Sequence, residues 1–240
     1  MRLFQYWDTG EPPNEMAGWI DRFRSSNPEM KHRLYNRESA AWFIGKHLGL
    51  RQRKAFDACA VPAMQADYFR LCALFARGGL WIDADVEPLK PIAGLLDRAP
   101  HSLMLSWQGF LQTPVMLFRE TGDAFVGAFL DLVTANIVER RFNNVLIATG
   151  PLVADALRGV IDPQWAETEI SKAQGVFAEA RRGLLEHVRA RLVVTEALRR
   201  SFGAMTIMGT LAAMDHVHFW DPPYKLTATH WTNWKGSIYV

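Results

Sequence analysis

Residues 62–91 read PAMQADYFRLCALFARGGLWIDADVEPLKP, and this stretch decides the fold class. Apolar side chains recur at spacings of three and four over residues 64–77, which predicts an amphipathic helix. Gly78 and Gly79 can end that helix in a left-handed conformation. The short apolar run 80–82 is then typical of a buried central strand. A helix, a glycine turn and a buried strand in this order indicate an α/β domain.

The segments on either side of this stretch also alternate between strand and helix patterns. Upstream, residues 3–7 predict a strand, Trp19, Ile20 and Phe23 have helical spacing, Leu34 and Tyr35 suit a second strand, and the chain from Ser39 to Gly49 is again helical. Downstream, the pattern predicts strands at 102–107 and 115–118, helices at 124–140, 152–160 and 171–200, and loops with short strands from His216 onward.

Composition narrows the classes of protein that the chain can belong to. Its 240 residues are 49% apolar, which is enough for one compact domain with a sizeable core. The net charge of +2 comes from acids and bases mixed along the chain, so nucleic acid is not an expected partner. Cys59 and Cys72 are too few for a disulfide framework and are expected in the core. Without a signal-peptide pattern or a membrane-length apolar run, we expect a cytoplasmic location.

Asp83 and Asp85 follow the predicted central strand directly and are the first candidates for chemistry. Two residues apart in an extended segment, they leave the same face of the backbone, with Cα atoms roughly 6.5–7 Å apart. Ligands of open α/β sheets gather beyond the carboxyl ends of the strands. Carboxylates in such a crevice favour Mg²⁺ or Mn²⁺, which usually complete their coordination with substrate phosphates. The pair therefore predicts a metal site for a phosphorylated ligand.

An Asp-x-Asp alone is more often a solvated turn, so its surroundings matter. Asp67 and Arg70 are three apart on the preceding helix and share a face. Taken alone, they would be read as a surface ion pair worth well under ~1 kcal/mol. Because the double glycine folds the helix back against the strand, both side chains can instead point toward the crevice of Asp83 and Asp85.

The spacing Pro-x₄-Asp-x₂-Arg-x₃-Leu-x₃-Gly-Gly-x₃-Asp-x-Asp-x₂-Pro-x₂-Pro over residues 62–91 resembles the signature of family 32 glycosyltransferases. These DXD sugar transferases are related to yeast mannosyltransferases, bacterial capsular-polysaccharide transferases and the glucosyltransferase domain of large clostridial toxins. Weaker similarities to the family occur in four further elements along the chain. They are Phe4-Gln5-Tyr6-Trp7, Asn27-Pro28-Glu29, Thr149-Gly150-Pro151 and His230-Trp231-Thr232-Asn233-Trp234.

The resemblance implies a GT-A-type fold, a Rossmann-like mixed sheet flanked by helices, as a single domain over residues 1–240. Residues 1–120 would bind the nucleotide-sugar, and residues 121–240 would form a helical, acceptor-side half. The implied activity is metal-dependent and retaining transfer of a sugar from a UDP- or GDP-sugar to a hydroxyl of a carbohydrate, lipid-linked or protein acceptor. The implied cofactor is Mn²⁺ or Mg²⁺, and the implied setting is polysaccharide or glycoconjugate synthesis.

The same resemblance assigns roles to five residues of the N-terminal half. Trp7 would stack on the base of the donor. Asp67 and Arg70 would hold sugar hydroxyls. Asp83 would contact the ribose or the sugar as well as the metal shell, and Asp85 would bind the metal directly.

Further roles are implied for residues outside the central motif. Trp81 would face the donor, and Thr113 stands where the family has an Asn that faces the sugar. His230 or Asn233 would complete the metal or diphosphate contacts, with a hydrogen-bonded loop histidine as the plainer interpretation of His230. Trp234 would cover the donor or belong to the core.

Three alternatives remain open at this stage. A metal-dependent nucleotidyltransferase or phosphohydrolase also uses paired aspartates, although phosphatases of that type usually carry them after the first strand. A non-catalytic sugar-nucleotide-binding protein would fit the same motif. Finally, the arginines of the last helices form either a solvated face or a surface for anionic lipid or a lipid-linked acceptor. These arginines are Arg181, Arg182, Arg189, Arg191, Arg199 and Arg200.

Overall fold

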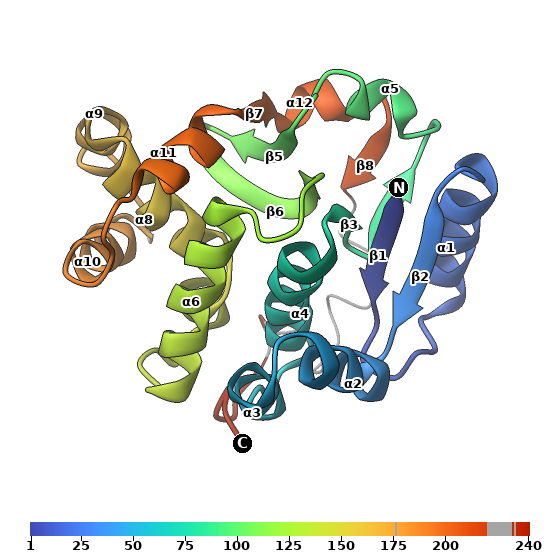
Figure 1. The fold of residues 1–240 in the computed structure, drawn as a ribbon, viewed down its shortest axis with the longest axis horizontal. Helices are drawn as coiled ribbons and strands as arrows, with labels where there is room; N and C mark the ends of the chain where they lie inside the picture. Colours follow the sequence, from blue (N-terminus) through green and yellow to red (C-terminus); the bar gives the residue numbers. More distant parts are fainter. Residues whose placement is uncertain (176, 220–231, 233) are drawn as a thin grey trace.

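The computed structural model describes residues 1–175, 177–219, 232 and 234–240. Among these residues, six strands form one sheet in the order β2-β1-β3-β6-β5-β7, and β4 pairs with β8 in a separate ribbon (Figure 1). The strands are β1 (Arg2–Tyr6), β2 (Lys31–Tyr35), β3 (Gly79–Ile82), β4 (Val86–Pro88), β5 (Ser102–Trp107), β6 (Phe110–Phe118), β7 (Met205–Gly209) and β8 (Val217–Phe219).

The strand directions place most strand ends at one edge of the large sheet. β2 and β3 both run parallel to β1. β6 is antiparallel to β3 and to β5, and β7 is parallel to β5. As a result β1, β2, β3, β5 and β7 all end at the same edge, called the carboxyl edge below. In a sheet of this kind, that edge is where ligands bind.

Helices cover both faces of this sheet (Figure 1). One core joins the sheet to α2, α4, α6 and α8, and a second joins it to α1 and α5. The helices are α1 (Asn14–Ser26), α2 (Arg37–His47), α3 (Leu50–Asp57), α4 (Pro62–Arg77), α5 (Ala93–Leu96), α6 (Ala124–Val138), α7 (Val145–Ala148), α8 (Pro151–Ile161), α9 (Pro163–Trp165), α10 (Ala178–Arg189), α11 (Glu196–Gly203) and α12 (Thr210–Ala213), with a π-helical turn η1 (Ala166–Ile170).

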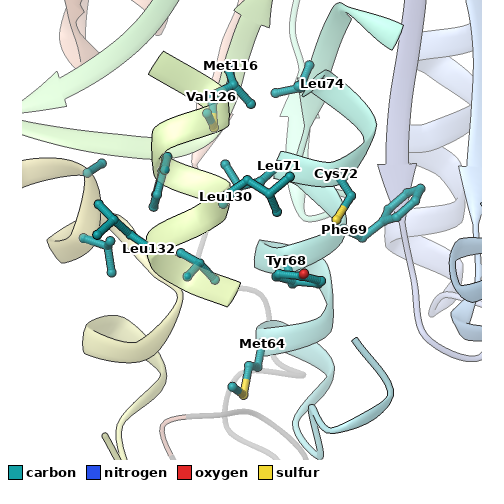
Figure 2. Close-up of a cluster of buried hydrophobic side chains, with 14 of the residues drawn as sticks. Met64, Tyr68, Phe69, Leu71, Cys72, Leu74, Met116, Val126, Leu130 and Leu132 are labelled. Atoms are coloured by element: carbon teal, nitrogen blue, oxygen red, sulfur yellow. The ribbon is translucent and has the colours of Figure 1, made fainter. Parts of the chain in front are cut away.

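The central strand β3 shows why its sequence is continuously apolar. Trp81 packs in the core between the sheet and α4, whereas Leu80 and Ile82 pack in the core on the side of α1 and α5. On the first side, α4 lies against α6, and Leu71 and Leu74 meet Val126 and Leu130 in the buried cluster of Figure 2. A strand buried on both faces has no polar positions, and this accounts for its lack of alternation.

The glycine turn between α4 and β3 cannot be made by other residues. Gly78 has φ +57°, and a Cβ there would lie 2.6 Å from the Arg119 carbonyl oxygen. Gly79 has φ +127°, and its Cβ would lie 2.8 Å from the Arg2 carbonyl oxygen. Both positions need glycine because positive φ and backbone contact exclude a side chain. The turn therefore fixes the angle at which α4 meets the strand that ends at Asp83.

Several sequence predictions need correction in detail. The strand predicted at 115–118 begins at Phe110, and its pairing with β5 shifts between Met104 and Leu105, so that residues 113–115 have no partner on β5. Pro114 lies in this interruption, as expected for a residue without a backbone donor. The helix predicted at 171–200 is wrong as one element, because α10 and α11 are separate. Helix α3 was not predicted from the sequence.

The fold class is confirmed: one mixed sheet flanked by helices in an α/β arrangement. Cys59 and Cys72 are buried free thiols, as expected. The division of roles between residues 1–120 and 121–240 stays a prediction. Within the described residues, no helix has the length and apolar character needed to span a membrane.

Candidate active site

A cleft of about 250 Å³ lies at the carboxyl edge of the sheet, directly beyond β3. Asp83 and Asp85 both line it, as the sequence predicted for two residues after the central strand. The backbone N–H of Asp83 donates to the Pro114 carbonyl oxygen at 2.8 Å, which fixes the strand end against β6. The cleft is lined by Asp83, Asp85, Val86, Trp107, Gln112, Pro114, Thr210 and Phe219.

Two donors hold the carboxylate of Asp83 in place. Arg70 donates from Nη2 to Oδ1 of Asp83 at 2.8 Å, and the Trp81 indole donates from Nε1 to the same oxygen at 2.6 Å. The Arg70 guanidinium also lies 5.3 Å from the centre of the Trp81 ring. Since Arg70 and Trp81 are both buried, neither donor has freedom to leave the carboxylate. The Asp83 carboxylate is thus held in a fixed orientation at the cleft.

Arg70 joins a second acid to this arrangement. The same Nη2 lies 3.1 Å from Oδ1 of Asp67, whose Oδ2 accepts a hydrogen bond from the Thr149 hydroxyl at 3.0 Å. The Arg70 side chain is 4% exposed and that of Asp67 14%, so the interpretation as a surface ion pair is wrong. Thr149 precedes α8 and brings the Thr-Gly-Pro element of the sequence to the helix face of Asp67. The predicted approach of α4 to the strand end is confirmed.

Burial and the positive charge of Arg70 shift the pKa values of these acids in opposite directions. Burial raises the pKa of Asp83 to about 6; the Arg70 guanidinium lowers it and the neighbouring Asp85 raises it. Burial also raises the pKa of Asp67, against the lowering effects of Arg70 and the Thr149 hydrogen bond. One buried guanidinium therefore offsets two carboxylates, while Asp85 adds a third negative group at the cleft.

The ribbon of β4 and β8 closes the side of the cleft next to Asp85. Val86, the first residue of β4, pairs with Phe219 at the end of β8. This pairing brings a segment from far along the chain against the Asp-x-Asp turn. Phe219 thereby becomes a wall of the cleft, although 134 positions separate it from Asp85.

The donor set fits a hard divalent cation in part. Asp83 and Asp85 offer carboxylate oxygens, the ligand type that Mg²⁺ and Mn²⁺ prefer. No group of three or more His, Cys, Asp or Glu side chains suited to a metal occurs among the described residues. The predicted ligands His230 and Asn233 lie outside the described residues. Two aspartates at a cleft match a cation whose remaining ligands come largely from a bound diphosphate.

Comparison with known proteins shows which proteins this motif resembles. Residues 13–102 match the family model described as a glycosyltransferase sugar-binding region containing a DXD motif. This part of the chain is therefore similar to the sugar-binding regions of DXD glycosyltransferases. It contains every acid of the Arg70 arrangement and both cleft aspartates. The resemblance to DXD sugar transferases found from residues 62–91 is confirmed.

Two individual proteins are also similar. Over 98 residues the chain is 26% identical to the initiation-specific alpha-1,6-mannosyltransferase of Schizosaccharomyces pombe. This alignment covers 38% of this chain and 25% of the yeast protein. The chain thus spans about a quarter of that relative. Among solved structures, the PaToxG glycosyltransferase aligns over 85% of this chain and 84% of its own, with a TM-score of 0.48 and 14% identity.

The other residues with predicted donor contacts are not among those that line the cleft. Trp7 is half-buried and follows β1 at the carboxyl edge, next to β3. Trp81 is 1% exposed, so it supports Asp83 rather than presenting a surface. Thr113 is buried and is not among the residues that line the cleft, and Trp234 donates to the Ser237 carbonyl oxygen at 3.1 Å. Donor contacts of these residues stay predictions.

Sequence reasoning missed most of the cleft wall opposite the aspartates. Trp107 and Gln112 come from the β5–β6 hairpin, and Thr210 follows β7. A two-residue turn joins β5 to β6, but the sequence predicted that the strand after β5 begins only at residue 115. The one available signal was Pro114, whose lack of a donor marks an interruption in a strand.

Proposed function

We propose that this chain is a metal-dependent retaining glycosyltransferase that moves a sugar from a UDP- or GDP-sugar to an acceptor hydroxyl. The observation that carries the proposal is the arrangement in which Arg70 and Trp81 orient Asp83 at a cleft beside Asp85. It lies inside a region that matches sugar-binding DXD transferases. Because the yeast relative is named a mannosyltransferase, mannose is the first donor sugar to test.

Mn²⁺ or Mg²⁺ bound by Asp85 and Asp83 would neutralise charge on the departing nucleoside diphosphate. The chain itself supplies position. Arg70 and Trp81 keep one oxygen of Asp83 occupied and so fix the direction of its carboxylate. Preorganised groups of this kind lower the barrier because they need no rearrangement during the reaction.

Retention of configuration is proposed from the resemblance to family 32 transferases, and the acids that line the cleft bear on the mechanism. Among the described residues lining it, Asp83 and Asp85 are the acids, and both are assigned to the metal. A separate carboxylate nucleophile of the glycosidase kind is therefore not part of the proposal. The acceptor oxygen bonds to the anomeric carbon from the side on which the bond to the diphosphate breaks. Its proton passes to the departing diphosphate oxygen.

The position of the aspartates in the fold supports this reading over a phosphohydrolase. Phosphatases with an Asp-x-Asp nucleophile usually carry it after the first strand, whereas here it follows β3 and β1 ends at Tyr6. A lipid-binding arginine surface receives less support. Arg181 pairs with Asp155, Arg189 with Glu186 and Arg191 with Glu139.

The test is release of nucleotide from a panel of UDP- and GDP-sugars, GDP-mannose included, with Mn²⁺, Mg²⁺ or a chelator. We expect release from a subset of donors that depends on the metal. Release from no donor, together with no Mn²⁺-dependent binding of UDP or GDP, would overturn the proposal. Metal-dependent binding without turnover would identify a non-catalytic sugar-nucleotide-binding protein.

The base contact has its own variant. Trp7→Ala should raise the KM for the donor, because the indole at the end of β1 is proposed to stack on the nucleotide base. Trp42→Ala is the matched control, since Trp42 is 55% exposed on α2 and contacts Lys46. An unchanged donor KM in Trp7→Ala would show that Trp7 only packs.

A further inference from the structure

Trp107 presents an exposed aromatic surface at the cleft that holds the paired aspartates. It is the last residue of β5, its side chain is 47% exposed, and it lines the cleft together with Asp83 and Asp85. Because this exposed indole lies on a cleft wall, a ligand that enters the cleft can cover it. Flat amphipathic rings suit the apolar faces of sugar rings, whose edges carry hydroxyls.

The hairpin that carries Trp107 is tight. Trp107 pairs with Phe110, so that only Gln108 and Gly109 form the turn. Their φ values are +50° and +83°, which corresponds to a two-residue turn of type I′. A glutamine in this left-handed conformation is unusual and costs stability. Such a conformation persists where the surroundings over-determine it.

Side chains of α8 and α10 supply those surroundings. Arg158 donates to the Gly109 carbonyl oxygen at 3.1 Å. The Leu111 backbone N–H donates to Oδ1 of the buried Asp155 at 2.8 Å. Arg181 lies 3.8 Å from the centre of the Phe110 ring and 3.4 Å from Oδ2 of Asp155. The helical layer thus fastens three consecutive residues of the hairpin, and the position of Trp107 is fixed with them.

The strand order separates Trp107 from the proposed nucleotide side. In the sheet, β3 with Asp83 lies between β1, which ends next to Trp7, and the pair β6 and β5, which carries Trp107. If Trp7 meets the base and the aspartates meet the diphosphate, the sugar end of the donor points toward β5. An acceptor must approach that end. Trp107 therefore lies where an acceptor enters, on the far side of the diphosphate from the base.

We infer that Trp107 is the stacking surface of an acceptor subsite and that the acceptor is a carbohydrate, whose pyranose ring lies on the indole. This inference rests on the proposed function. Gln112 and Thr210 line the same cleft and offer amide and hydroxyl groups to the hydroxyls of that ring. The Thr210 hydroxyl donates to the Ser106 carbonyl oxygen at 2.9 Å, so its own oxygen can accept a hydrogen bond from the sugar.

The experiment compares wild type, Trp107→Ala, Trp107→Phe and the exposed-tryptophan control Trp42→Ala. The probes are methyl α- and β-glycosides of mannose, glucose, galactose and N-acetylglucosamine. Their binding is followed by saturation-transfer NMR with Mn²⁺ and UDP or GDP present. Their glycosylation is followed with the donor that the nucleotide-release test identifies. We expect Trp107→Ala to raise the acceptor KM on the order of tenfold, while the donor KM changes less than twofold. Trp107→Phe should recover part of the loss, and Trp42→Ala should resemble wild type.

The outcomes separate this inference from the proposed function. A donor KM that rises together with the acceptor KM in Trp107→Ala would assign Trp107 to the donor sugar and overturn the inference. A wild type that releases nucleotide but neither binds nor glycosylates any glycoside would also overturn it and leave the proposed function standing. If no donor is turned over, the proposed function fails. In that case, unchanged glycoside binding in Trp107→Ala would overturn the inference as well.

Discussion

Two buried clusters of the chain each combine a carboxylate with an arginine, but the two carboxylates face different surroundings. Near the cleft, Arg70 and the Trp81 N–H hold Asp83, whose side chain is 25% exposed. In the helical layer, Arg181 and a backbone N–H hold Asp155, whose side chain is 1% exposed. The first cluster presents a carboxylate to the cleft, whereas the second fastens a hairpin. The two acids thus differ in their exposure rather than in the kinds of group that hold them.

Removing the guanidinium should produce the largest difference between the clusters. Arg70→Met leaves Asp67 and Asp83 without their shared cation in a buried site, at a cost of about 3–5 kcal/mol. Arg181→Met should cost less, about 1–2 kcal/mol, because Asp155 keeps its bond from the Leu111 N–H and can take up a proton. Urea unfolding of both variants at pH 7 checks this order. Equal losses of stability would show that Arg70 contributes no more to the folded state than Arg181 does.

The second cluster should give the protein a pH-dependent stability. Burial raises the pKa of Asp155 to about 7, against the lowering effects of the Leu111 N–H and of Arg181 and Arg158. In the unfolded chain this carboxyl titrates near ~3.9. Between these values the native state keeps a proton that the unfolded state has released, so the free energy of unfolding falls as pH rises from about 4 to 7.

Asp155→Asn should remove that contribution. We expect its free energy of unfolding to fall less than that of wild type between pH 5 and pH 8, measured by urea unfolding at both values. The side chain of the variant has no proton to lose, so the comparison isolates this group. A pH dependence identical to wild type would show that Asp155 is ionised throughout this range.

The two clusters also differ in how far the sequence predicts them. Asp67, Arg70 and Asp83 lie within 17 consecutive positions, and a helix period, a glycine turn and a strand suffice to bring them together. Asp155 and Leu111 are 44 positions apart, and Asp155 stands as a lone acid in an apolar helix. Such a residue gives no local sign of its partner. Only the tertiary packing of α8 against β6 reveals it, and Trp107 went unrecognised for the same reason.

The hydrogen bond from Thr149 to Asp67 should have a smaller effect than the loss of Arg70. Thr149→Val leaves one oxygen of the buried Asp67 without its donor, at about 1–2 kcal/mol. Thr113→Val is a matched control, because Thr113 is also buried. Thermal unfolding compares their stability, and the donor KM of Thr113→Val tests its predicted sugar contact. Equal destabilisation by both substitutions would show that the hydrogen bond from Thr149 to Asp67 contributes little to stability.

A substitution in the β5–β6 hairpin turn should change the free energy of unfolding least, and it should stabilise the protein. Gln108→Asn places a residue that tolerates positive φ at φ +50° and should stabilise the protein by roughly 0.5 kcal/mol. Gln52→Asn on α3 is the control and should be slightly destabilising, because asparagine is the poorer helix former. Precise chemical denaturation distinguishes the two signs. A destabilising Gln108→Asn would show that the Gln108 side chain contributes more than its backbone strain costs.

The proposal that matters most is that Asp83 and Asp85, the half-buried acids at the cleft, bind the metal and the donor. Its most direct test is nucleotide release by Asp85→Ala with Mn²⁺ and the best donor, beside Asp97→Ala as an exposed-acid control on α5's C-terminal side. We expect a loss of at least about a hundredfold for Asp85→Ala, with an unfolding temperature close to that of wild type and an active control. Metal-dependent release within tenfold of wild type, or a variant that fails to fold, would contradict it.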